Sequence, residues 1–472
     1  MSQLFAERRV PRAARTARGV DIALVVYRPM AKLDVDRLIV HAAELLTCGG
    51  PQSGIRGAAL RGVETITDGA LAIRGERIVA VGTSAEITAA YAAPDVIDAA
   101  GRLVTPGLVD PHSHLVYGGT RHEEYEAKVT QRAAAVPMEA GIRSTVRRTR
   151  AASDRVLVAQ ALGDLDVMLA HGTTTLEAKT GYGLDGDEEL RLLRLTAGLL
   201  HPLQVVPTFL ALHVLPPGYE GRRQAYLEQA MAALPEACKL APYCDVSCDP
   251  GCFTFDECLQ VGEAARALGM KIRLHADQHG DARGALLAAR LQASSADHLD
   301  YASDEGLRAM ADAGSVATLL PGVTLHLCEM TPRFEGAALG PAEKPFMPLV
   351  ARRAIEAGAV VALSTDYNPG SCPTPSMQMV MQLAARLYRL GYAEIWNMCT
   401  LNAARALDLA HDRGSLEPGK RADVVLWSVP SHGMVINRFG VNLADTVMVS
   451  GRIVVRSGRL LSRRRARHGA GR

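Results

Sequence analysis

The feature that most constrains this chain is an apolar run that leads into two closely spaced histidines, within Asp110-Pro111-His112-Ser113-His114. Side chains along a strand alternate between two faces, so a His-x-His pair at the end of a strand points both imidazoles to the same side. Two imidazoles aimed at one point are half of a metal site. A surface His-x-His at a strand end is the alternative, and partner residues elsewhere in the chain decide between the two.

The middle of the chain alternates between apolar strands and amphipathic helices, which is the pattern of an α/β protein. Strands are predicted at residues 108–114, 173–179, 204–210, 243–248, 271–276, 294–299, 315–320 and 360–366. Helices are predicted between them, for example at 187–200, 256–268 and 304–313. Eight strand–helix units in succession predict a (β/α)8 TIM-like barrel, in which active residues gather at the C-terminal ends of the strands.

The two ends of the chain carry a different pattern, that of short β segments broken by glycine. Residues 68–82 predict a hairpin with Gly75-Glu76 at its turn. Similar short β segments are found again only near the C-terminus. We expect one small β-sandwich domain built from both terminal regions. The predicted parts are an Arg-rich, poorly ordered N-terminal extension (1–32), the sandwich (33–105 and 412–455), the barrel (106–411) and an Arg-rich C-terminal tail (456–472).

The formal net charge of +2 conceals a charge asymmetry. Residues 1–31 carry a net +4 and residues 456–472 a net +7, which leaves the body of the chain at −9. This balance argues against a specific nucleic-acid partner for the body, and binding through the basic tails is the minor alternative. No window approaches the ~18 apolar residues of a membrane span. Because the N-terminus lacks a secretory apolar region and cleavage signature, a cytoplasmic location is expected, with a transit peptide as the alternative.

Nine cysteines in a long chain without a signal peptide are interpreted as reduced thiols. Four of them are grouped, namely Cys244, Cys248, Cys252 and Cys258. Their spacing is not that of a zinc ribbon, and the first two fall on a predicted strand. Small buried residues are therefore favoured over a metal cluster.

Polar residues follow the predicted strands at the end where a barrel places its function. His275 ends the fifth strand, His298 the sixth and Asp366 the eighth, while His112 and His114 end the first. Imidazoles together with a carboxylate suit zinc, iron or manganese, and such a metal lowers the pKa of a bound water to roughly 7. The carboxylate can accept the proton of that water, and a histidine that is not a ligand can serve the leaving group. The pattern predicts hydrolysis at a carbonyl-like carbon.

These motifs resemble the metal-dependent amidohydrolase superfamily and, within it, the imidazolonepropionase family of histidine degradation. The resemblance covers about residues 33–455 and rests on the runs at 110–121, 179–184, 212–213, 275–278, 295–299 and 364–371. The run at 179–184 separates this family from its cousins better than the metal ligands do. The reaction that the resemblance implies is the opening of the ring of 4-imidazolone-5-propanoate by water, which gives N-formimino-L-glutamate.

The resemblance also implies roles for individual residues. One divalent metal ion, zinc or iron, would be held by His112, His114, His275 and Asp366. The implied catalytic residues are His298, as acid or base, with Asp366, Gln278 and His213. Arg121 would hold the propionate, because a planar guanidinium offers two parallel donors to a carboxylate. The implied substrate contacts are Arg121, Tyr182, His213, Gln278, Asn368, Gly370 and Ser371. The expected partner is a small molecule that carries a carboxylate, and a homodimer is expected because it is common in the family.

Some positions depart from what the family or superfamily leads us to expect. Superfamily members with two metals usually place a bridging lysine or glutamate at the end of the fourth strand, where this chain has residues 246–248 and Asp249. Lys179 closes the second strand instead, so a single-metal site is predicted, and Asp249 is the one residue that complicates this prediction. Ser113 replaces the usual threonine, and residues 137–141 replace an expected glycine-rich run. The alternatives are another amidohydrolase, acting on a different cyclic amide or deaminating an N-heterocycle, and a non-catalytic scaffold.

Overall fold

The computed structural model describes residues 12–14, 22–24, 32–130, 141–330 and 350–461. Strands β1 (Arg12–Ala14) and β2 (Ile22–Leu24) form an antiparallel pair within the N-terminal extension. The prediction that both Arg-rich ends are poorly ordered concerns segments that lie mostly outside the described residues. Within the described part of the chain, no helix has the length and apolar character needed to cross a membrane.

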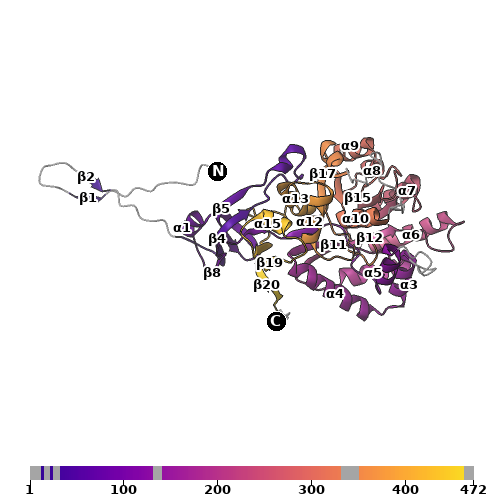
Figure 1. Ribbon diagram of the computed structural model, residues 1–472, viewed down its shortest axis with the longest axis horizontal. Helices are drawn as coiled ribbons and strands as arrows, with labels where there is room; N and C mark the ends of the chain where they lie inside the picture. Colours follow the sequence, from indigo (N-terminus) through magenta and orange to yellow (C-terminus); the bar gives the residue numbers. More distant parts are fainter. Residues whose placement is uncertain (1–11, 15–21, 25–31, 131–140, 331–349, 462–472) are drawn as a thin grey trace.

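The middle of the chain forms the predicted barrel of eight parallel strands, which lie side by side in the order of the sequence. The barrel makes up the larger part of the molecule in Figure 1. The strands are β10 (Leu108–Asp110), β11 (Thr173–Lys179), β12 (Gln204–Leu212), β13 (Tyr243–Cys248), β14 (Lys271–Ala276), β15 (Ser295–His298), β16 (Val316–Leu319) and β17 (Val360–Leu363). A parallel bridge between Ser113 and Tyr367 joins the segments that follow the first and last strands. The backbone N–H of Asp366 donates to the carbonyl of His112 at 3.0 Å, and that of His114 donates to the carbonyl of Tyr367 at 2.8 Å. These bonds close the barrel.

Helices cover the outside of the barrel, as expected for strands that are buried on both faces. They are α2 (His122–Val129), α3 (Ile142–Ala151), α4 (Asp154–Ala170), α5 (Gly186–Ala197), α6 (Arg223–Ala237), α7 (Phe255–Ala267), α8 (Gly284–Leu291), α9 (Asp304–Asp312), α10 (Pro321–Met330), α11 (Val350–Glu356), α12 (Met377–Leu387), α13 (Tyr392–Cys399) and α14 (Leu401–Ala406). Local sequence sets where several of them begin. Thr254 and Glu257 form a capping box at α7, and the Ser303 side chain accepts the backbone N–H of Gly306 at the start of α9.

The two terminal regions meet in one nine-stranded sheet beside the barrel, which confirms a small β domain assembled from both ends (Figure 1). Its strands are β4 (Arg37–Leu46), β5 (Thr65–Arg74), β6 (Arg77–Thr83), β8 (Asp95–Asp98), β9 (Val104–Pro106), β18 (Val424–Trp427), β19 (Ala444–Val449), β20 (Arg452–Arg456) and β21 (Arg459–Leu460). The predicted hairpin is β5 with β6, and the two halves join where β18 pairs with β9. Along β4, Ile39 enters one apolar cluster while Leu38 and Val40 enter another, as the alternation of a strand requires.

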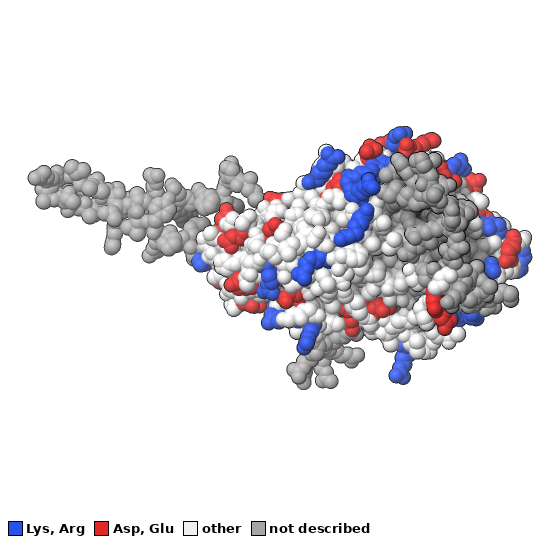
Figure 2. Space-filling view, viewed as in Figure 1, with Lys and Arg blue, Asp and Glu red and all other residues white. Residues whose placement is uncertain are grey.

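Smaller elements in the same terminal regions are β3 (Leu33–Asp34), β7 (Tyr91–Ala92), the short helices α1 (Ser84–Ala90) and α15 (His432–Asn437), and the 3-10 helix η1 (Gly57–Arg61). Acidic and basic side chains are interspersed over the face of the molecule seen in Figure 2. No large field of one sign covers the described residues of that face.

The first and last barrel strands are shorter than predicted. The first ends at Asp110 rather than at residue 114, because Pro111 has no N–H to continue the ladder. The eighth ends at Leu363, three residues before Asp366. The metal-site candidates of these two strands therefore lie in short segments just beyond the strands, and the Ser113–Tyr367 bridge keeps those segments together.

Candidate metal centre and active site

The structure brings the strand-end residues to one point inside the barrel rim. The side chains are those of His112, His114, His275, His298 and Asp366, and all are buried. The Nε2 atoms of His114 and His275 are 3.3 Å apart. Asp366 Oδ1 lies 3.4 Å from His112 Nε2 and 3.5 Å from His114 Nε2.

These side chains fit a metal ion. Two groups, His112 with His114 and His275, and His112 with His298 and Asp366, each offer ligand atoms that lie within 4.8 Å of one another. His112 Nε2, Asp366 Oδ1 and both ring nitrogens of His298 are buried without a hydrogen-bond partner. Buried polar atoms that lack partners are costly, and a divalent cation would satisfy several of them at once. Imidazole nitrogens with a carboxylate oxygen are a donor set for zinc or iron.

Burial sets the protonation of the centre. It lowers the pKa of His112 and of His114 well below the usual range, so both are neutral imidazoles near pH 7. Burial also raises the pKa of the Asp366 carboxyl to about 7. His275 differs: burial would lower its pKa, but the neighbouring Asp245 carboxylate outweighs burial and raises it.

A second ring of contacts orients the histidines. His112 Nδ1 lies 2.6 Å from Asp297 Oδ2, His275 Nδ1 lies 2.9 Å from Asp245 Oδ1, and His114 Nδ1 lies 3.3 Å from the carbonyl oxygen of Thr180. With Nδ1 so engaged, each ring presents Nε2 to the centre, which is how metal-binding histidines are commonly held. Asp245 and Asp297 are absent from the sequence-based prediction. The only available signal was their position, three residues and two residues before the ends of their predicted strands.

The backbone at two of the strand ends is unusual. His298 has φ of 78°, Leu299 has φ of 64° and Asp366 has φ of 50°, all in the left-handed region. Residues other than glycine rarely adopt this conformation, and such strain concentrates at functional sites. It turns the His298 and Asp366 side chains toward the histidines of the first strand.

Tyr182 and His213, both expected to contact the substrate, lie beside the candidate ligand His114. The His213 ring stacks on His114 with 5.2 Å between centroids, and the Tyr182 ring is 5.5 Å from His114 and 5.6 Å from His213. His213 Nδ1 lies 2.7 Å from the carbonyl oxygen of Gly181. These two side chains form one wall beside the candidate ligands.

Asn368, Gly370 and Ser371 belong to a tight turn after Asp366. Asn368 Oδ1 accepts the backbone N–H groups of Gly370 and Ser371, both at 2.8 Å. Asn368 Nδ2 donates to the carbonyl of Asp366 at 2.7 Å. The Asn368 side chain thus holds the turn together, because its amide is bonded to the backbone of Asp366, Gly370 and Ser371.

Arg121 reaches this turn from the loop after the first strand. Its Nε and Nη2 donate to the Glu124 carboxylate at 3.0 and 2.5 Å, and Glu124 also accepts the backbone N–H of Gly141 at 2.7 Å. Sequence reasoning identified Arg121 but missed Glu124, although a carboxylate three residues along a helix is a recognisable partner. Of the unusual segment 137–141, only Gly141 is among the described residues.

Gln278 follows His275 in a loop that is fixed by Asp249. Asp249 Oδ1 accepts the backbone N–H groups of Gln278 at 2.7 Å and of His279 at 3.0 Å, and Asp249 Oδ2 contacts His279 Nδ1. Both Asp249 oxygens are therefore engaged in holding the loop that carries Gln278. Among the described residues, no group with metal-ligand geometry includes Asp249 or any cysteine.

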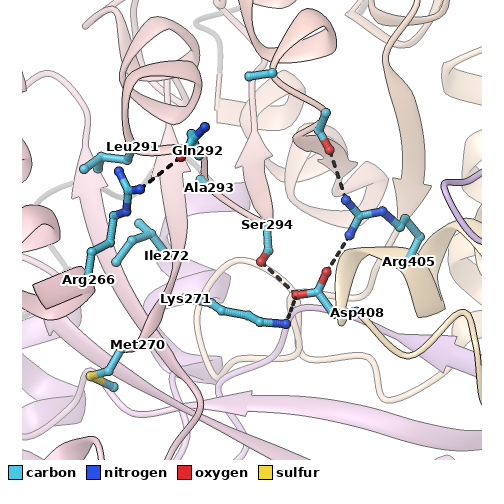
Figure 3. A pocket seen from close by; sticks show the side chains of 12 residues that line it. Arg266, Met270, Lys271, Ile272, Leu291, Gln292, Ala293, Ser294, Arg405 and Asp408 are labelled. Carbon is cyan, nitrogen blue, oxygen red and sulfur yellow. Dashed lines mark hydrogen bonds and ion pairs between the residues drawn. The ribbon is translucent and has the colours of Figure 1, made fainter. Parts of the chain in front are cut away.

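A separate pocket lies at the opposite end of the barrel, next to the N-terminal ends of β14 and β15 (Figure 3). Asp408 organises it, because its carboxylate accepts from Lys271 at 2.8 Å, from Ser294 at 3.0 Å and from Arg405 at 2.5 Å. The polar groups of this pocket bind one another. In a barrel, contacts at the N-terminal end of the strands contribute to stability rather than to catalysis.

Comparison with protein families agrees with this geometry. Residues 103–454 match the amidohydrolase family, and residues 69–93 match the imidazolonepropionase-like composite domain of bacteria. Among solved structures, a zinc-bound adenosine deaminase from Xanthomonas campestris has a TM-score of 0.61 at 18% identity, covering 92% of this chain and 95% of that one. A mutant atrazine chlorohydrolase from Arthrobacter aurescens, in complex with zinc and atraton, has a TM-score of 0.64 at 17% identity, covering 90% and 96%. These two structures establish the fold.

Similarity to curated proteins is closer. The imidazolonepropionase of Symbiobacterium thermophilum is 42% identical over 443 residues, which is 91% of this chain and 99% of that protein. The imidazolonepropionase of Alkaliphilus metalliredigens is 39% identical over 441 residues, which is 90% of this chain and 100% of that protein. The family resemblance inferred from the motifs is thereby confirmed: this chain belongs to the imidazolonepropionase family of the amidohydrolases.

Proposed function

We propose that this protein hydrolyses the ring C–N bond of 4-imidazolone-5-propanoate to give N-formimino-L-glutamate, a step of histidine degradation. The observation that carries the proposal is the meeting of three histidines and Asp366 at one buried point, with unpartnered atoms facing one another. Relatives named imidazolonepropionase match about nine-tenths of the chain, so both the barrel and the small domain are shared with them.

In this proposal His112, His114, His275 and Asp366 hold one divalent metal ion, zinc or iron. When bound, such an ion polarises a carbonyl oxygen and lowers the pKa of a water to roughly 7. A single ion is favoured because the Lys179 ammonium already contacts Glu177 and Asp245, and because Asp249 is engaged with backbone N–H groups. The Lys179 ammonium therefore supplies the positive charge that a second metal ion would otherwise bring to Glu177 and Asp245.

The proton transfers are assigned to His298 and Asp366. Asp366 Oδ1 lies 3.4 Å from His112 Nε2 and 3.5 Å from His114 Nε2 and has no hydrogen-bond partner among the described residues, so the carboxylate is placed to accept a proton at the candidate metal site. The His298 ring is buried and has two ring nitrogens without a protein partner, which leaves it available to the departing ring nitrogen of the substrate. Gln278 and His213 are proposed to assist by orienting the reacting groups.

Substrate recognition is assigned to residues on the loops of the same rim. Arg121 is proposed to bind the propionate carboxylate through those guanidinium donors that Glu124 leaves available. The other proposed substrate contacts are Tyr182, His213, Gln278, Asn368, Gly370 and Ser371. Tyr182 and His213 are supported by their rings, which lie within 5.6 Å of each other and of His114.

The proposal extends to the organisation of the protein. We assign residues 106–411 to the catalytic barrel and residues 33–105 with 412–455 to the small domain. We further propose a homodimer in the cytoplasm. Light scattering coupled to gel filtration tests the dimer, since a monomer at micromolar concentration contradicts it.

One assay tests the reaction directly. Imidazolone propionate is generated in situ from urocanate, and the loss of its absorbance is followed after addition of purified, metal-loaded protein. We expect rapid loss that depends on the protein and is abolished by His112→Ala. No turnover at full metal occupancy would contradict the proposed substrate and leave only the amidohydrolase family.

A further inference from the structure

A cluster of five charged side chains lies beneath the metal centre, inside the barrel. They come from four strands of the barrel and are Glu177 and Lys179 on β11, Asp245 on β13, Arg273 on β14 and Asp297 on β15. Each is at most 1% exposed. Burying a charge costs several kcal/mol per ion unless it is paired, so the pairing of these five side chains must offset a large desolvation cost.

Lys179 is the shared partner within this cluster. Its ammonium lies 2.9 Å from Glu177 Oε1, 3.0 Å from Asp245 Oδ2 and 3.6 Å from Asp297 Oδ2. Asp245 uses its other oxygen to contact His275 Nδ1, and Asp297 uses Oδ2 to contact His112 Nδ1. A single ammonium therefore touches both carboxylates that orient candidate metal ligands from two different strands.

Arg273 is placed less well for this task. Its Nη1 donates to the carbonyl of Ala406 at 2.7 Å and its Nη2 to the carbonyl of Pro111 at 2.6 Å. It shares Asp297 with Lys179, at 3.4 Å against 3.6 Å, but among the described residues no ion pair joins it to Asp245. The compact ammonium of lysine, with three donors, matches the three surrounding carboxylates better than a planar guanidinium does.

An ionised carboxylate is an acceptor only, so it fixes the proton of its histidine partner on Nδ1. The Lys179 ammonium lies 3.0 Å from Asp245 Oδ2 and 3.6 Å from Asp297 Oδ2, and an adjacent cation favours the ionised form of a carboxylate. Lys179 thus supports both carboxylates as acceptors.

We propose that Lys179 is a positioning residue that locks Asp245 and Asp297 as acceptors for His275 and His112, so that both rings present an unprotonated Nε2 to the metal ion. This inference rests on the proposed metal site. Its consequence is that a residue that touches no candidate ligand sets the affinity of the site for its metal.

The test is the zinc affinity of Lys179→Met, measured by competition with a chromophoric chelator. Loss of an outer contact typically weakens metal binding about 10- to 100-fold, and we expect a loss in that range. The visible spectrum of the cobalt-substituted protein should also change, since the ligand geometry relaxes. Asp408→Asn is the matched control, because it removes a half-buried ion-paired carboxylate at the opposite end of the barrel. It should lower thermal stability without changing zinc affinity or the cobalt spectrum.

A folded Lys179→Met protein with the zinc affinity and cobalt spectrum of the unmodified protein would overturn the inference. His112→Ala separates this result from failure of the metal site itself. If His112→Ala still binds zinc normally, the proposed metal site is wrong. If His112→Ala loses zinc while Lys179→Met keeps it, the metal site stands and the proposed role of Lys179 is wrong.

Should Lys179→Met fail to fold, histidine ¹⁵N resonances of the unmodified, metal-free protein give a second test. Signals are assigned with single-histidine variants. Protons on Nδ1 of both His112 and His275 support the inference. A neutral ring with its proton on Nε2 instead of Nδ1, at either residue, contradicts it.

Discussion

Gly370 and Arg121 lie so close together that a Cβ on residue 370 would stand 2.0 Å from Arg121 Nη1. On its other edge the Arg121 guanidinium donates to Glu124 through Nε and Nη2. The arginine is therefore held in a slot, with a carboxylate on one side and a glycine on the other. In our proposal this slot points the arginine at the substrate carboxylate.

Gly370→Ala should displace Arg121, because no real Cβ contact is as short as 2.0 Å. We expect KM for imidazolone propionate to rise about tenfold, the effect of weakening one charge-assisted hydrogen bond, with metal content unchanged. Gly163→Ala is the control: it lies in α4 with open space around its Cβ, and should leave KM as it is. Steady-state kinetics measure KM, and metal analysis measures metal content. An unchanged KM in Gly370→Ala would contradict the proposed positioning of Arg121 by Gly370.

Arg121→Ala should raise KM about 10- to 100-fold, since hydrogen bonds to charged groups contribute about 1.5–3 kcal/mol. Arg121→Lys should recover only part of the loss, because an ammonium does not bind a carboxylate through two parallel donors. Zinc content should match that of the unmodified protein in both variants. An unaltered KM in Arg121→Ala would remove this residue from the substrate site.

His298→Asn distinguishes two roles that the geometry allows, because His298 also falls in a group with ligand spacing. If His298 transfers a proton, kcat should fall about 10²- to 10⁴-fold while zinc affinity stays the same. We expect this outcome. A matching loss of zinc would instead identify His298 as a ligand.

Asp412 should stabilise the fold in a pH-dependent way. Burial would raise its pKa, but Arg77, Arg413 and Arg421 outweigh burial and lower it to about 2. Because the folded pKa lies below the value of 3.8 for an ordinary aspartate, the stabilisation is complete above pH 4 and is lost as the pH falls toward 2.

Asp412→Asn should therefore cost about 1 kcal/mol at pH 7, a value reduced for solvent screening of this partly exposed group, and close to nothing at pH 2. Urea unfolding at several pH values measures the difference. Asp312→Asn, on the exposed end of α9, should change stability little at any pH. An equal cost for Asp412→Asn at both pH values would contradict the assignment.

The sequence was sufficient to predict the barrel and the candidate ligands, because each rests on a local pattern. His275 and His298 end apolar strands, and parallel strands of a barrel bring such ends together. Gly75-Glu76 likewise predicted its hairpin from turn chemistry alone. These features depend only on residues near in sequence and on the general geometry of the fold.

Other parts of the site depend on register between strands, which the sequence does not display. Asp297 contacts a histidine from the first strand, and Asp245 contacts one from the next strand. A buried aspartate inside a predicted strand offers no local sign of its partner. The left-handed backbone at His298 and Asp366 is equally invisible, because tertiary contacts rather than side-chain preference impose it.

The closure of the barrel has a consequence for how the protein is made. Asp110 accepts hydrogen bonds from Ser364, 254 positions later in the chain, and the bridge that closes the barrel joins Ser113 to Tyr367. During synthesis, the first histidines leave the ribosome long before Asp366 exists. A chain that stops short of the eighth strand holds neither the closed barrel nor the candidate carboxylate ligand Asp366, so the closed barrel and the complete candidate metal site arise together.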